Sequence, residues 1–221
     1  MAVDAAELKR LTDEFKGSPG FRVHTEINNN RRSLRILSRN RDELLQALAS
    51  ARQAGASAEA QALAREELAR RLEGFLSPAF DLLDYTRRYC RKMYEGTEYA
   101  KEIQSEIDRR FIFERDFKIA QGLRSITAHV DSLAQDKLPT KQLLAWDDWN
   151  DNQRAILESM KEDVDVQAFS EAYFRRMEEF YSWLWKRQSE IHAEDLARAE
   201  ELRLRAKEAY DRLFPTNDAR S

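Results

Sequence analysis

The chain has 221 residues, of which 35% are charged and 42% are hydrophobic, and its formal net charge is -3. This length can bury a substantial core, and the apolar content is too high for a disordered chain. The near balance of 37 basic and 40 acidic residues excludes a global attraction to nucleic acid or acidic lipid, but it leaves room for a local basic patch. Six Gly and four Pro are few for a strand-rich fold, so we expect long helices.

The sequence also indicates a compartment. A single cysteine, Cys90, cannot form an internal disulfide, and nothing points to an oxidising environment. Charged residues lie near the N-terminus, where a signal peptide carries an apolar segment. No apolar run approaches the roughly 20 residues that span a bilayer. We therefore expect a cytoplasmic protein that does not contact a membrane.

The first half of the chain predicts amphipathic helices separated by short breaks, because leucines and aromatic residues recur at helical spacing. The predicted helical ranges are 4–16, 26–54, 58–76 and 78–95, with a connection at 21–25. Ser57 is a suitable N-cap, and Pro78 suits the first position of a new helix after a break near Gly74.

The second half continues in the same way. Residues 98–133 predict one or two helices, residues 134–139 a loop, and residues 140–161 a helix capped by Thr140. A long helix then ends near residue 191 and continues as a charged segment, 192–214, with a thin apolar stripe. We expect this segment to project as an arm or to pack against a partner.

Together these elements predict an all-α fold, a multi-helix bundle with long antiparallel helices and a charged C-terminal helical arm. The predicted organisation is an N-terminal helix and connection at 1–25, a helical bundle at 26–191, and a C-terminal extension at 192–221.

One predicted helix, residues 112–134, carries the candidate chemical site. On a helical wheel its apolar residues share one face, and a polar stripe lies opposite. The stripe consists of Lys118, Gln121, Ser125, His129 and Ser132. Ser125 and His129 are four residues apart and are therefore neighbours. Arg124 lies about 140° around the helix from His129. Its long side chain, or a second copy of the helix across a two-fold axis, could still bring both groups to one cleft.

The stretch from Phe117 to His129, FKIAQGLRSITAH, resembles the Arg-x(4–6)-His signature of HEPN domains. The similarity to bacterial HEPN-like helical proteins extends over about 98–187. It includes a Leu-Pro loop, the segment LLAWDDW and the aromatic helix that follows Val-Asp-Val. The resemblance implies a dimeric helical bundle that acts as a metal-independent endoribonuclease in a bacterial defence or toxin–antitoxin system. It also implies that Arg124 and His129 are catalytic.

The chemistry expected of such a site needs no metal and no cofactor. When the RNA 2′-OH attacks phosphorus, a histidine can move a proton to or from the reacting oxygens, and an arginine can bind the phosphate. Ser125 stands where the family usually has Asn, Asp or His. Its hydroxyl could orient His129 or bind a phosphate oxygen, but it cannot replace a charged partner.

Two alternatives stay open. In the first, the chain is a non-catalytic interaction protein with a degenerate site, which Ser125 favours, and binds a protein partner through residues 192–214. In the second, it is a nucleic-acid-binding module. The predicted nucleic-acid contacts are Arg31, Arg35 and Arg39, spaced four residues apart, together with Lys118. A second basic cluster, which could also follow a phosphate backbone, consists of Arg87, Arg88, Arg91 and Lys92. Such clusters are also typical of solvated faces paired with acidic residues.

Overall fold

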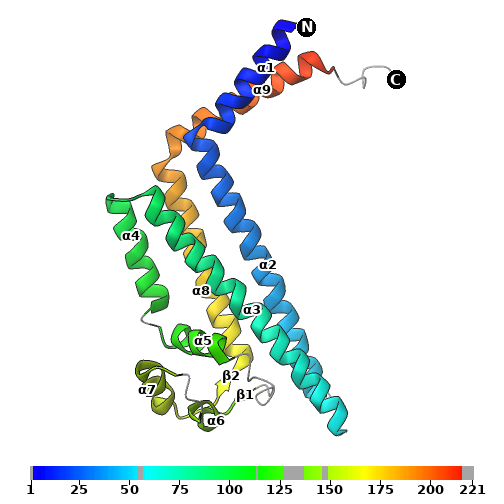
Figure 1. Cartoon of the computed structure of the whole chain (residues 1–221), viewed down its shortest axis with the longest axis vertical. Helices are drawn as coiled ribbons and strands as arrows, with labels where there is room; N and C mark the ends of the chain where they lie inside the picture. Colours follow the sequence, from blue (N-terminus) through cyan, green and yellow to red (C-terminus); the bar gives the residue numbers. More distant parts are fainter. Residues whose placement is uncertain (1, 54–56, 113, 127–136, 146–148, 216–221) are drawn as a thin grey trace. The chain divides into compact units, whose positions relative to one another are not determined.

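Figure 1 shows the computed structural model, which describes residues 2–53, 57–112, 114–126, 137–145 and 149–215. Across these ranges the chain is dominated by α-helix, and the only strands are two residues long, which confirms the predicted all-α class. No helix within the described ranges is long and apolar enough to cross a membrane. The chain divides into two compact units, residues 1–32 with 182–221 and residues 33–181.

The first unit contains the two ends of the chain. It is built from α1 (Ala2–Gly17), the start of α2 (Pro19–Gln53), the end of α8 (Val166–Ile191) and α9 (Ala193–Leu213). Helices α1 and α9 pack side by side (Figure 1) around buried Leu11, Leu202 and Ala209. Leu202, in the apolar stripe of the charged C-terminal segment that was expected to project or to meet a partner, therefore packs against α1 of the same chain.

A single residue separates α1 from α2. The hydroxyl of Ser18 accepts a hydrogen bond from the backbone N–H of Phe21 at 3.2 Å, and Pro19 is the first residue of the new helix. Residues 21–25 are therefore helical, and the predicted connection there is wrong. The error has a physical cause, because a cap followed by Pro restarts a helix without any intervening loop.

Helix α3 (Ala58–Met93) belongs to the second unit. Its Arg71 forms an ion pair with Glu43 of α2, and the hydroxyl of its Thr86 lies 2.7 Å from that of Tyr181 on α8. The hydroxyl of Ser57 accepts a hydrogen bond from the N–H of Ala60, so the predicted N-cap is confirmed.

Helix α3 continues through Gly74 and Pro78, so the break predicted there is wrong. Pro78 has no N–H and leaves the carbonyl of Gly74, four residues earlier, without its helical donor. The side-chain amide of Asn40, on α2, donates to this carbonyl at 2.7 Å. The compensating donor lies on a different helix, which explains why the local sequence pattern does not reveal it.

We expect Asn40→Ala to lower the free energy of unfolding by about 1 kcal/mol, because the Gly74 carbonyl loses its donor while still partly accessible to water. Urea unfolding measures this change. In a Pro78→Ala background the helix supplies its own N–H, so the same substitution should cost much less. An equal loss in both backgrounds would contradict this explanation of the continuous helix.

A π-helical turn (Asp108–Ile112) joins α4 (Glu98–Ile107) to α5 (Arg115–Ile126). The turn places Phe111 in the core of the second unit. Its ring centroid lies 5.8 Å from that of Phe117 on α5, and 6.3 Å and 5.6 Å from those of Tyr173 and Phe180 on α8. This aromatic cluster fixes the start of α5 against α8.

The helix predicted over 140–161 is instead two short helices, α6 (Thr140–Leu144) and α7 (Asp151–Ser159). A capping box between Asn150 and Gln153 starts α7 afresh. The indole N–H of Trp149 donates to the carbonyl of Leu143 at 2.6 Å and so satisfies a carbonyl at the end of α6. Thr140 is the first residue of α6 rather than its cap.

Two strands, β1 (Lys137–Leu138) and β2 (Val164–Asp165), pair antiparallel with Lys137 opposite Asp165 and Leu138 opposite Val164. Strand β1 lies within the predicted loop at 134–139. Strands this short cannot display the alternation that identifies a strand.

Candidate functional site

Helix α5 carries the part of the predicted site that the structure describes. It packs against α3 and α7, and its Ile119, Ala120 and Leu123 are buried, as the wheel predicted. Phe117, which the wheel did not place on that face, is buried as well. Arg124 and Ser125 lie in its last turn. His129 and Ser132 lie outside the described residues.

A cavity of about 280 Å³ lies between α3, α5 and α7 and borders the polar stripe of α5. We call it the α3–α5–α7 cavity. Two stripe residues, Lys118 and Gln121, belong to its wall, and Arg87 of α3 joins them. The lining residues are Phe80, Asp84, Arg87, Ile112, Phe117, Lys118, Gln121, Asn150, Asn152 and Gln153. The stripe identified from the sequence therefore borders a concave surface with cationic and amide side chains.

The guanidinium of Arg87 has two different environments. Its Nη1 donates to the carboxylate of Asp84 at 3.3 Å. Its Nε and Nη2 are buried and have no hydrogen-bond partner among the residues that the structure describes. From the sequence, Arg87 is only one member of a basic cluster, because its burial depends on tertiary packing.

The start of α7 completes the cavity wall. Asn150 caps this helix, and the exposed Asn152 follows in its first turn. The N-terminal end of a helix carries partial positive charge, which adds to the field of the two cations. Asn150 and Asn152 were not predicted as site residues, although the pattern Asn-Asp-Asn-Gln at 150–153 is a recognisable helix start.

Gly122 allows α7 to approach α5 closely. A Cβ built at Gly122 would overlap the six-membered ring of Trp149, which lies directly before the cap of α7. Trp149 is 5% exposed and is held by its hydrogen bond to Leu143. This glycine–tryptophan contact therefore sets the distance between two walls of the cavity.

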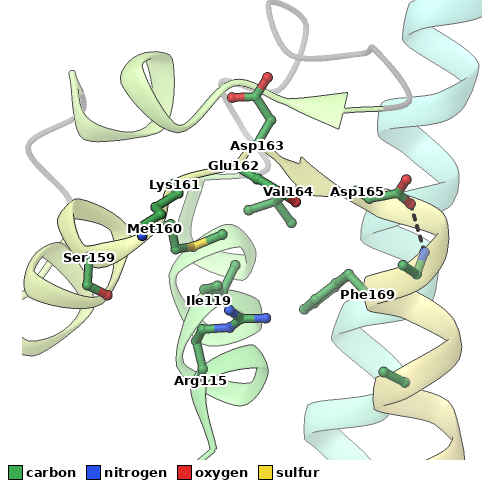
Figure 2. A pocket seen from close by; sticks show the side chains of 12 residues that line it. Arg115, Ile119, Ser159, Met160, Lys161, Glu162, Asp163, Val164, Asp165 and Phe169 are labelled. Atoms are coloured by element: carbon green, nitrogen blue, oxygen red, sulfur yellow. Dashed lines mark hydrogen bonds between the residues drawn. The ribbon is translucent and has the colours of Figure 1, made fainter.

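Figure 2 shows a larger cavity of about 610 Å³ that α5 also borders, where Arg115 lies opposite Phe169 of α8. Two of the three acidic residues that line it already have structural roles. Asp163 accepts a hydrogen bond from the N–H of Thr140 at 3.0 Å, and Asp165 caps the start of α8, as the dashed line indicates. Since these acids stabilise the fold, this cavity is the weaker candidate for chemistry.

The three arginines predicted on α2 are all exposed, and the structure shows how each is placed. The guanidinium of Arg31 lies 5.2 Å from the ring centroid of Trp185, and Arg39 pairs with Glu43 at 3.0 Å. Arg35 is exposed. Two of these three arginines thus have partners within the chain, and Lys118, the fourth predicted contact, lies in the wall of the α3–α5–α7 cavity.

Comparison of the chain with protein-family models, with curated proteins and with solved structures finds no match in any of the three. In its described residues the chain has an all-α fold with two helical units. Any assignment of function therefore depends on the residues around α5.

Proposed function

We propose that this chain is a HEPN-like protein that binds RNA along the polar stripe of α5 and cleaves it without a metal ion, acting as a homodimer. The observation that supports this is the position of Lys118 and Gln121. Both belong to the stripe, and both line a cavity that also contains Arg87. Cations and amide groups in a concave wall suit a phosphate backbone.

In the proposed reaction Arg124 binds the scissile phosphate and offsets the negative charge that grows on its oxygens. The 2′-oxygen bonds to phosphorus, and the bond from phosphorus to the 5′-oxygen breaks. The 2′-OH loses its proton, and the leaving 5′-oxygen gains one. His129 transfers one of these protons. The products are a cyclic 2′,3′-phosphate and a 5′-hydroxyl.

We expect His129→Ala to slow cleavage of single-stranded RNA by at least about 100-fold in the presence of EDTA, because proton transfer contributes on that scale. Gel analysis of end-labelled RNA measures the rate, and circular dichroism verifies folding. His24→Ala is the matched control, since His24 is an exposed histidine on α2 whose ring lies 3.3 Å from the side-chain amide of Asn28, one turn along the helix. This variant should cleave as fast as the wild type.

Two results would overturn the catalytic proposal. One is equal cleavage by the wild type and by His129→Ala, which would assign the activity to a contaminant or another residue. The other is a wild-type protein that binds RNA but leaves every RNA intact, which would favour the non-catalytic alternative that Ser125 suggests.

A further inference from the structure

We infer that Arg87 is an anion-binding residue and that it binds a phosphodiester in the α3–α5–α7 cavity. The identity of this ligand rests on the proposed function. The sequence distinguishes Arg87 only as one member of a basic cluster, and the residue lies on α3 rather than on the helix with the HEPN-like motif. The inference starts from its two buried nitrogen atoms without partners in the described part of the chain.

These two atoms form one edge of the guanidinium group. Nε and Nη2 present their N–H groups in parallel, and this fork matches two oxygens of a phosphate or carboxylate. Asp84 engages the remaining nitrogen, Nη1, and holds the group in the cavity wall. A buried charged donor without an acceptor is destabilising, so an oxyanion that supplies both acceptors is favoured.

The charge of the lining suits a singly charged anion. Arg87 and Lys118 contribute two positive charges and Asp84 one negative charge, so the titratable lining carries a net charge of one positive. A phosphodiester carries one negative charge. The N-terminal end of α7 adds further positive potential at Asn150 and Asn152.

The size of the cavity also limits the ligand. At about 280 Å³ it lies at the small end of ligand pockets. The rings of Phe80 and Phe117, with centroids 5.2 Å apart, form a buried apolar part of its lining. A single phosphate with its attached sugar fits this description better than a folded RNA element, so the cavity binds one position along a single strand.

The test is the affinity for a fluorescent single-stranded RNA oligonucleotide, measured by anisotropy over a range of salt concentrations. All proteins carry His129→Ala, so that the RNA stays intact. Arg87→Gln should weaken binding by about 10-fold at low salt, and it should reduce the slope of log K against log salt by about 0.7, the value for one lost phosphate contact on a single strand. Arg88→Gln, at the exposed neighbouring arginine, is the control and should leave the affinity within about twofold.

Arg87→Lys separates charge from geometry. It keeps the positive charge but loses the fork, so the salt slope should stay near that of the parent while the affinity falls. A thermal melt of each variant verifies that it is folded. If Arg87→Gln and Arg87→Lys bind the oligonucleotide as tightly as the parent, the inference is overturned.

A second measurement distinguishes this inference from the proposed function. Inorganic phosphate should raise the melting temperature of the wild type, relative to chloride at equal ionic strength, and should not raise that of Arg87→Gln. If phosphate behaves in this way but no RNA is bound, the anion site stands and the RNA function fails. If RNA is bound and cleaved equally with and without Arg87, the RNA function stands and the anion site fails.

Discussion

Gly122→Ala is expected to lower the free energy of unfolding by about 2–3 kcal/mol, even though alanine is the better helix former. The added methyl group would overlap the ring of Trp149. That ring cannot move aside cheaply, because it is buried and its N–H is bonded to the carbonyl of Leu143. Helix α7 must therefore move away from α5, and the substitution should also weaken RNA binding, since the two helices form opposite walls of the α3–α5–α7 cavity.

Gly74→Ala is the matched control, because Gly74 also lies in a helix and a Cβ there meets nothing within 4 Å. This variant should be more stable than the wild type by up to about 1 kcal/mol. Chemical denaturation followed by circular dichroism compares the two, and anisotropy measures RNA binding. A stabilising effect of Gly122→Ala would show that α5 and α7 do not meet as described.

Phe111→Ala should have the largest effect on stability, a loss of about 3–5 kcal/mol. Phe111 is 0% exposed and lies against Phe117, Tyr173 and Phe180. Removing its ring leaves a void that these large aromatic neighbours cannot fill without leaving their own contacts. Because Phe117 belongs to α5, the loss also loosens the helix that carries the proposed site.

The control for Phe111→Ala is Phe214→Ala, because Phe214 is 57% exposed beside Tyr210 at the end of α9. Its loss should change stability by less than about 0.5 kcal/mol. Both variants are measured by urea unfolding of the full chain. A change below 1 kcal/mol for Phe111→Ala would contradict the packing of the π-helical turn.

Helical spacing and cap residues were sufficient to predict the fold class, the cap at Ser57 and the buried face of α5. They could not predict the continuity of α3, because the donor that compensates for Pro78 is Asn40, on another helix. They also could not predict the division between α6 and α7, where the side chain of Trp149 takes the place of a helical donor. In both cases a side chain outside the helix supplies the hydrogen bond, and helical spacing alone does not predict such a contact.

The candidate site was predictable to a similar extent. The polar stripe with Lys118 and Gln121 follows from the helical wheel, and the structure places both residues at a cavity. The contribution of Arg87 did not follow from the sequence. Arg87 and Arg88 are chemically identical neighbours, and only packing makes Arg87 half-buried and Arg88 exposed. The cavity is lined by residues of three helices, so it depends on how these helices pack and does not follow from the pattern of any one of them.

The most direct test of RNA binding along α5 is amide hydrogen exchange of the full chain, carrying His129→Ala, with and without a saturating single-stranded RNA oligonucleotide. We expect slower exchange in peptides from α5 and from the start of α7 when RNA is present, and no change in α9. Protection confined to the segment of α2 with Arg31, Arg35 and Arg39, or no protection of α5 at all, would contradict the account.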